Sequence, residues 1–312
     1  MKMTGSNYAD TLIGGKKKDI IIGNDGNDLI SAWEDVGDGA ADEIEAGAGD
    51  DLIGGFSFNL DNVARSKSRG ASVEGGSGYD SVIVDVAGNA KTTLLNRIHQ
   101  VFDVKAEEII YNFSGATIKQ TITGTNANET IYIGEGGSKA LGGKGNDYLI
   151  GGQGDDVLSG GDGNDFLFAA GGRNELTGGK GADVFQFHLT EDYAYANITD
   201  FQVGVDKIAL LIDIGGEFAK DLFGDELRRT ERTMDDMGYI NYDDGRIIDR
   251  DLFANSQLRF TENMIYEQST GSFLQRVYLD DGAGGTIEYQ VLLAHLEGKP
   301  VLSEDDFIFY VL

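Results

Sequence analysis

Apolar residues recur at every ninth position between Gly142 and Phe185. This stretch divides without insertions into the nonamers GGKGNDYLI, GGQGDDVLS, GGDGNDFLF, AAGGRNELT and GGKGADVFQ. The eighth position of each unit is apolar and is occupied in turn by Leu149, Leu158, Leu167, Leu176 and Phe185. One apolar side chain in nine cannot form a core alone, but stacked coils bury all of them in one column. The period therefore predicts a stack of short strands joined by turns.

Glycine occupies the first, second and fourth positions of most units, at Gly142, Gly143, Gly145, Gly151, Gly152, Gly154, Gly160, Gly161, Gly163, Gly178 and Gly179. Because glycine accepts positive φ angles, the first six residues of a unit can turn tightly. The last three residues can then extend as a short strand. A flexible glycine-rich linker is the alternative interpretation, but a linker has no column of Leu and Phe at a fixed period.

An acid occupies the sixth position of four of these units, at Asp147, Asp156, Asp165 and Asp183, and Asn174 takes its place in the fourth unit. In a stack of coils these carboxylates repeat along the same edge and repel one another unless cations lie between them. Calcium takes roughly 6–8 oxygen ligands from carboxylates and backbone carbonyls. The pattern therefore indicates several calcium ions bound between the turns.

These nonamers resemble the GGxGxDxUx repeats of the RTX, or hemolysin-type, family of secreted calcium-binding proteins. The resemblance implies a flattened β-roll in which calcium is held between turns n and n+2. Carried over to this chain, it pairs Asp147 with Asp165 and Asp165 with Asp183, and it leaves Asp156 facing Asn174 in a weaker site. The register extends upstream to GTNANETIY at Gly124, where Glu129 takes the acid position and Ser138 leaves the next one without an acid.

A second, more divergent block of the same repeat begins near the N-terminus. Its sixth-position acids are Asp10, Asp19, Asp28, Asp42, Asp51 and Asp80. The same rule pairs Asp10 with Asp28, Asp19 with Asp42, and Asp28 with Asp51. Positive charge at Lys16, Lys17 and Lys18 is expected to weaken calcium binding in one turn.

Outside the repeats the pattern changes. Apolar residues of Thr92–Phe102 fall on one face of a helix, and a second, charged helix is expected over Glu217–Met237. The segment Asn197–Leu210 resembles the one that closes RTX rolls in serralysin-type proteases. Its Asp200 and Asp206 either ligate a last calcium or cap the final coil. From Tyr239 onward, alternating strands and Asp-Gly turns predict antiparallel hairpins that cover the end of the roll.

The expected fold is all-β, with two parallel β-roll blocks, short helical insertions and a C-terminal antiparallel β cap. We expect a first roll at residues 1–88, a helix and linker strands at 89–123, a second roll at 124–190, and a cap with an export signal at 191–312.

Composition narrows the function. The chain of 312 residues has 46 glycines, one proline, no cysteine and a formal net charge of −28. Disulfides and cysteine catalysis are therefore excluded, and the strong negative charge argues against nucleic acid as a partner. No apolar run is long enough to predict a transmembrane segment, and no secretory leader is recognisable at the N-terminus.

The C-terminal sequence LSEDDFIFYVL resembles the export signal of type I secretion, with Glu304, Asp305 and Asp306 followed by the apolar run 307–312. A final β-strand would have the same pattern. The resemblance implies release by the type I machinery of a Gram-negative bacterium to the outside or the cell surface.

No catalytic motif accompanies the repeats. The three histidines are scattered, and HExxH, GxSxG and P-loop patterns are missing. We therefore expect a non-enzymatic surface-layer, matrix or adhesin-type protein that assembles with itself or binds a cell-surface polysaccharide. The alternative is an extracellular enzyme acting on polysaccharides, with its site in the insertions or in the C-terminal region.

Overall fold

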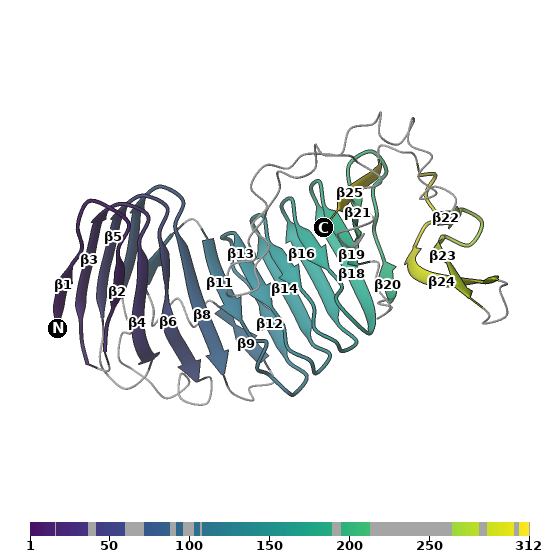
Figure 1. The fold of residues 1–312 in the computed structure, drawn as a ribbon. Helices are drawn as coiled ribbons and strands as arrows, with labels where there is room; N and C mark the ends of the chain where they lie inside the picture. The colour runs from purple at the N-terminus through teal and green to yellow at the C-terminus, as the bar shows by residue number, and fades with distance from the viewer. Residues whose placement is uncertain are drawn as a thin grey trace.

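The computed structural model describes residues 1–15, 17–36, 42–59, 72–87, 92–95, 103–106, 108–188, 195–212, 264–280, 286–302 and 306–311. In these ranges the chain forms a parallel β-solenoid of flat coils, stacked from the N-terminus towards β21 (Figure 1). Each coil contributes a strand to either side of the stack, as the nonapeptide period predicts.

One side of the solenoid is an 11-stranded parallel sheet, here called the long sheet. Its strands, in order, are β2 (Thr11–Ile13), β4 (Leu29–Val36), β6 (Leu52–Asn59), β8 (Ser81–Ala87), β11 (Glu108–Asn112), β13 (Glu129–Tyr132), β15 (Tyr148–Ile150), β17 (Phe166–Phe168), β19 (Val184–His188), β21 (Lys207–Ile212) and β25 (Phe307–Val311).

The other side is divided between two sheets. The N-terminal sheet contains β1 (Lys2–Thr4), β3 (Ile20–Asp25), β5 (Glu43–Ala48), β7 (Ser72–Ser77) and β10 (Asp103–Lys105). The C-terminal sheet runs through β9 (Thr92–Leu94), β12 (Thr121–Thr123), β14 (Lys139–Lys144), β16 (Val157–Asp162), β18 (Arg173–Lys180), β20 (Tyr195–Ile198), β24 (Thr286–Leu296), β23 (Ser272–Asp280) and β22 (Met264–Glu267).

The two predicted repeat blocks are thus stacked in one solenoid, because the long sheet continues from one to the other. Val84 pairs with Tyr111 across β8 and β11, and Tyr111 pairs with Ile131 across β11 and β13. Ile109, however, pairs with Val82 on one side and with Glu129 on the other, so the repeat register shifts by two residues at this junction. A shift of two keeps every side chain on its original face, and the apolar core stays continuous.

The predicted column of apolar side chains is confirmed. Leu149, Leu167 and Phe185 are aligned across β15, β17 and β19, and Leu158 is aligned with Leu176 across β16 and β18. All five side chains have no exposed surface. The first block continues the same core through Ile21, Ile30, Ile44 and Ile53, which are also buried.

The prediction of a helix at residues 92–102 is wrong for its first three residues. Thr92–Leu94 form strand β9, which pairs in parallel with β12. The β-branched Thr92 and Thr93 suit a strand, and the edge of the C-terminal sheet gives them a partner that helical periodicity does not consider. Leu95, the next residue, has helical geometry, and both residues 96–102 and the second expected helix, 217–237, lie outside the described residues.

The C-terminal region contains a small antiparallel part, as expected. Strands β22, β23 and β24 form an antiparallel hairpin series, and β24 joins β20 in parallel. The expected strands at 239–263 lie outside the described residues. The last strand, β25, is instead parallel to β21 and completes the long sheet. In the described ranges no helix is long and apolar enough to span a membrane.

Candidate metal sites

The acids of the repeat line two edges of the solenoid. Edge I consists of the turns that precede strands of the long sheet, with sixth-position residues Asp10, Asp28, Asp51, Asp80, Glu129, Asp147, Asp165, Asp183 and Asp206. Edge II consists of the turns that precede or enter strands of the other two sheets, with Asp19, Asp42, Gln120, Ser138, Asp156 and Asn174 at this position. The acids of edge I therefore continue through both repeat blocks.

Each edge is held by a ladder of hydrogen bonds between alternate turns. In the second block the backbone N–H of Asp147 donates to Oδ1 of Asp165 at 2.8 Å, and that of Asp165 donates to Oδ1 of Asp183 at 2.9 Å. The N–H of Asp156 donates to Oδ1 of Asn174 at 2.9 Å on edge II. The structure thus brings together the residue pairs expected eighteen positions apart.

The first block follows the same rule, with a spacing of 18 for its first pair and longer spacings of 23 and 29 where insertions lengthen the coils. The N–H of Asp10 donates to Asp28 at 2.9 Å, that of Asp28 to Asp51 at 2.7 Å, and that of Asp51 to Asp80 at 3.0 Å. On edge II the N–H of Asp19 donates to Asp42 at 2.7 Å. Ligation of a metal by these acids stays a prediction, but their expected neighbours are in place.

Several ladder carboxylates are buried with one oxygen unsatisfied. Oδ2 of Asp28, Asp51, Asp147, Asp165 and Asp183 has no hydrogen-bond partner, although each side chain is at most 2% exposed. An ionised carboxylate held in this way costs several kcal/mol unless a cation or a donor meets it. Hard, anionic oxygens that repeat along one edge are the donor set that suits calcium, so these residues fit the ion that the sequence predicts.

The electrostatics of the ladder agree with this fit. Burial, together with the neighbouring negative charge of Glu129, raises the pKa of Asp147 to about 7. Burial likewise raises the pKa of Asp165 and of Asp183 to about 6, with adjacent ladder carboxylates acting in the same direction. A bound dication supplies the positive charge that lets these groups ionise at neutral pH.

The first glycine of the repeat makes room for the carboxylate. A Cβ atom at Gly142, Gly160 or Gly178 would lie 2.3, 2.1 or 2.3 Å from Oδ2 of the acid five residues later in the same turn. Any larger residue would therefore displace that carboxylate. Calcium would be held by Asp147, Asp165 and Asp183 together with carbonyl groups of these glycine turns.

Asp200 and Asp206 lie where the second roll ends. Oδ1 and Oδ2 of Asp200 accept the N–H groups of Gly178 and Gly179, each at 2.9 Å. The two oxygens of Asp206 accept the N–H groups of Asp183 at 3.0 Å and Gln202 at 2.8 Å. Of the two roles left open by the sequence, this geometry favours capping of the final turns.

Sequence reasoning missed the contact of Asp306 with edge I. Its side chain is fully buried, and its Oδ1 accepts the N–H of Gly204 at 2.9 Å from about a hundred positions away. The repeat gives no signal for it, because β25 pairs Phe307, not Ile308, with the eighth-position residue Ile208, so Asp306 is one residue away from the sixth position.

A second ladder, formed by fifth-position residues, was also missed. Asn128 accepts the N–H of Asn146 and Asn146 accepts the N–H of Asn164, both at 2.8 Å, through their side-chain oxygens. The next such bond, also at 2.8 Å, runs from the N–H of Ala182 to Asn164. The asparagine that recurs directly before the ladder acid in several units is the sequence feature from which this second ladder could have been predicted.

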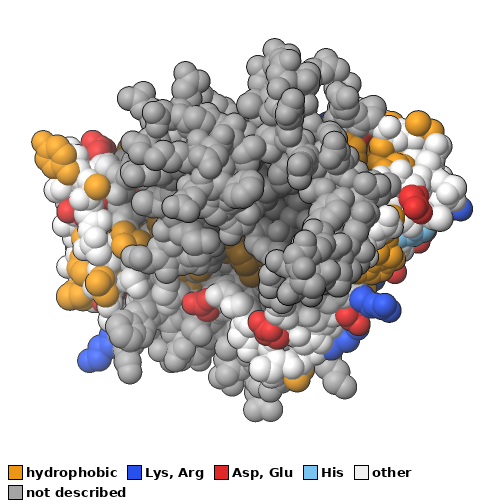
Figure 2. Space-filling model, turned by 45° about the vertical axis from the view of Figure 1, so that its right-hand side comes forward, with side chains coloured by type: hydrophobic (Ala, Val, Ile, Leu, Met, Phe, Trp, Pro, Cys, Tyr) orange, Lys and Arg blue, Asp and Glu red, His pale blue; other side chains and the backbone are white. Residues whose placement is uncertain are grey.

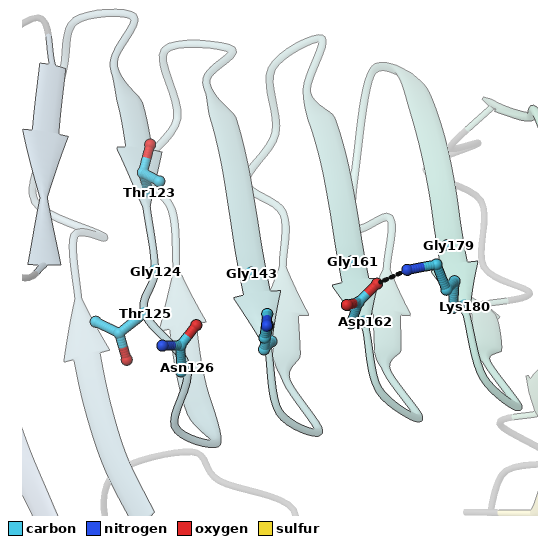
Figure 3. Close-up of a pocket in the computed structure, with 10 residues that line it drawn as sticks. Thr123, Gly124, Thr125, Asn126, Gly143, Gly161, Asp162, Gly179 and Lys180 are labelled. Atoms are coloured by element: carbon cyan, nitrogen blue, oxygen red, sulfur yellow. Dashed lines mark hydrogen bonds and ion pairs between the residues drawn. The ribbon is translucent and has the colours of Figure 1, made fainter.

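A shallow groove crosses the beginning of the edge I turns (Figure 3). It is lined by Thr123, Thr125, Asn126, Lys144, Asp162 and Lys180, with repeat glycines between them. Lys180 pairs with Asp162 at 2.6 Å, but both groups are solvent-exposed, so the pair contributes little stability. On the face of the molecule shown in Figure 2, acidic and basic side chains likewise lie beside one another, at the lower right.

A parallel solenoid with acid ladders at its turns defines a calcium-type β-roll. Comparison with protein families identifies RTX calcium-binding nonapeptide repeats at residues 4–35, 132–167, 141–176 and 159–186. A comparison with curated proteins gave no match. The chain therefore contains RTX calcium-binding repeats, which form an aspartate-lined β-roll. The ladder extends beyond the matched stretches, to Asp51, Asp80 and Asp206.

Proposed function

We propose that this protein is exported unfolded and folds outside the cell when calcium binds the acid ladder of edge I. The observation that carries the proposal is the set of buried ladder carboxylates whose Oδ2 atoms have no partner. Without a cation their mutual repulsion and desolvation oppose folding. With one, the free energy of binding becomes free energy of folding.

The apparent size of the full chain with and without calcium tests this proposal. A compact chain of this length has a radius of gyration of about 20 Å and an unfolded one about 60 Å. Size-exclusion chromatography with light scattering should show a large contraction on adding calcium. The same compact size in a chelator would contradict the proposal.

The outside of the cell is the proposed location because RTX repeat proteins are typically secreted. Cytosolic calcium is scarce, so the chain would stay unfolded and threadable until it emerges. We propose that residues 303–312 are read as a type I export signal before folding, and that Phe307–Val311 form β25 afterwards.

Export can be separated from folding with two variants in a cell that carries type I machinery. Deletion of residues 303–312 should retain the protein inside the cell. Asp206→Ala disturbs the same final coil without altering the last ten residues, so it should still be exported. Appearance of the deletion variant in the medium at the normal level would refute the signal.

The proposed role of the folded protein is structural, as a non-enzymatic surface-layer, matrix or adhesin-type component. A net charge of −28 opposes close packing of copies unless cations neutralise it. Calcium would thus promote self-assembly as well as folding. Light scattering across a calcium titration should show mass growth above the folding midpoint, and a monomer at ten times that concentration would exclude assembly.

The second candidate is an extracellular protein that acts on polysaccharides, favoured by the groove of Figure 3. Lys144 and Lys180 along this groove could contact the carboxylates of a uronate polymer. The carboxylate in the groove, Asp162, is paired with Lys180 and has a lowered pKa because of that contact. Incubation with alginate and other uronate polymers in calcium decides: released oligosaccharides would establish the enzyme.

A further inference from the structure

The turns of the solenoid are of two kinds. In the first kind, here called capped, the N–H four residues before the ladder acid donates to the second oxygen of that acid. The N–H of Gly152 donates to Oδ2 of Asp156 at 2.9 Å, that of Gly15 to Asp19 at 2.6 Å, and that of Gln202 to Asp206 at 2.8 Å. Both carboxylate oxygens are then satisfied by the chain itself.

In the second kind, here called open, the N–H of the residue four positions before the ladder acid does not donate to the carboxylate of that acid. Gly143, Gly161 and Gly179, four residues before Asp147, Asp165 and Asp183, have φ angles of +117°, +121° and +109°. The Oδ2 atoms of these three acids are the ones without partners.

The first block repeats this division. The second-position residues of its open turns are Asn24, with φ +81° before Asp28, and Gly47, with φ +121° before Asp51. Oδ2 of both acids again has no partner. A backbone at positive φ and an unsatisfied carboxylate oxygen thus occur together in both blocks.

The strands explain why the open turns lie on edge I, where only the turns of Asp10, Glu129 and Asp206 are seen to be capped among the described residues. In the C-terminal sheet, β14 and β16 extend to Lys144 and Asp162, and Gly143, Gly161 and Gly179 lie in paired positions of β14, β16 and β18. In the long sheet, β15 and β17 have only three residues and end before the turn begins. Their second-position N–H groups are therefore available to cap the ladder acid.

The sequence of edge II reinforces the capped form. Its turns place Ala169 and Ala170 at the first two positions of one unit, and an alanine at φ above +100° would be strained. Gly152 lies in the neighbouring turn and stacks closely on the chain, since a Cβ there would be 2.4 Å from the carbonyl oxygen of Gly134. The turn GGQGDD matches the GGxGxD repeat, but its backbone follows the same path as the adjacent edge II turns, whose sequences depart from that repeat.

We infer that calcium is held only at the open turns, so that in the second block edge I is the metal edge and edge II is a metal-free hydrogen-bonded zipper. The metal rungs are then Asp147, Asp165 and Asp183, with Asp28 and Asp51 in the first block. This inference rests on the proposed calcium function and narrows it, because the sequence still counts Asp156 and its glycines among the metal residues, in a weaker site.

Edge II of the second block can close without a metal. The hydroxyl of Ser138 accepts the N–H of Gln120 at 3.1 Å, and Oδ1 of Asp156 accepts the N–H of Ser138 at 2.6 Å. Nδ2 of Asn174 donates to the carbonyl of Gly171 at 2.7 Å. Calcium at Oδ2 of Asp156 would compete with the Gly152 N–H for the electron density of that oxygen, whereas Oδ2 of Asp165 accepts no hydrogen bond that a metal would weaken.

Two matched substitutions test the inference in the full chain. Asp165→Asn and Asp156→Asn make the same change at the sixth position of consecutive repeats, one in an open turn and one in a capped turn. Isothermal titration with calcium chloride gives the number of ions bound and the midpoint. Asp165→Asn should lose bound calcium and raise the midpoint by about tenfold or more, corresponding to one charged ligand at roughly 1.4 kcal/mol. Asp156→Asn should bind the wild-type number of ions.

The outcomes separate this inference from the proposed function. An equal loss of calcium in the two variants would overturn the inference and leave calcium-driven folding intact. No change of calcium binding in either variant would contradict the proposed function itself. If Asp156→Asn fails to fold, Asp156→Ser replaces it, since Ser138 shows that a serine rung is compatible with this ladder. Its stoichiometry should again equal that of the wild type.

Discussion

At the scale of single residues, the protein depends on glycines that touch carboxylates. Gly160 is a clear case, because a Cβ there would lie 2.1 Å from Oδ2 of Asp165 and 2.6 Å from its Cβ and Cγ. The ladder carboxylate therefore depends on the absence of a side chain at the first repeat position as well as on the charges around it.

Gly160→Ala should raise the calcium concentration needed for half-folding, because overpacking at a buried contact typically costs 1–3 kcal/mol. Gly115→Ala is the matched control, since nothing lies within 4 Å of a Cβ at that position. Calcium titrations followed by circular dichroism measure both. Equal midpoints for the two variants would show that the close contact has no energetic consequence.

Asp165 should matter more than Asp183. Asp165 lies between two open rungs, Asp147 and Asp183, whereas Asp183 is followed by the capped Asp206. Asp165→Ala should therefore perturb two calcium sites and Asp183→Ala one. Calcium midpoints of the two single variants check this, and identical midpoints would contradict the pairing of alternate turns.

At the scale of elements, the sequence was sufficient wherever the nonapeptide period holds. The buried column from Leu149 to Phe185 and the eighteen-residue pairing of Asp147 with Asp165 follow from the period alone. The junction at β9 and β10 did not follow, because those strands have no repeat and depend on which sheet edge they meet. Open and capped turns were also indistinguishable, since GGKGND and GGQGDD differ in neither glycines nor acid.

The last coil also contains a contact that the local sequence pattern does not predict, and this contact can be tested by mutation. Asp306 contacts the last turn of edge I across about a hundred residues, which no local pattern encodes. Asp306→Ala should leave the exposed N–H of Gly204 to water in place of its carboxylate acceptor, at a cost of about 0.5–1.5 kcal/mol. Hydrogen exchange at Gly204 should accelerate in the calcium-loaded variant, while Glu135→Ala, an exposed acid, should leave it unchanged. Unchanged exchange in Asp306→Ala would show that this contact does not protect Gly204.

At the scale of the whole molecule, folding should depend on pH in opposite directions with and without calcium. Asp147, with a pKa of about 7, and Asp165 and Asp183, with pKa values of about 6, bind protons more tightly when folded than at their ordinary value of 3.8. The folded chain thus holds more protons between about pH 4 and pH 7, so calcium-free stability falls as pH rises through that window. Protons also compete with calcium for the same oxygens.

Calcium titrations at pH 7.5 and pH 5.5 measure this competition. The calcium midpoint should be higher at pH 5.5, while the calcium-free chain should contain more β-structure at pH 5.5 than at pH 7.5. A midpoint independent of pH would mean that the buried carboxylates are not the calcium ligands.

The central claim is that calcium, acting at the buried ladder, folds the whole solenoid. Far-ultraviolet circular dichroism of the full chain at pH 7.5, titrated in parallel with calcium and with magnesium, tests it most directly. Magnesium demands small octahedral sites and keeps its water. The β-sheet signal should therefore rise cooperatively with millimolar calcium and stay near the chelator baseline with magnesium. A full β-sheet signal in chelator, or an equal rise with both ions, would contradict the account.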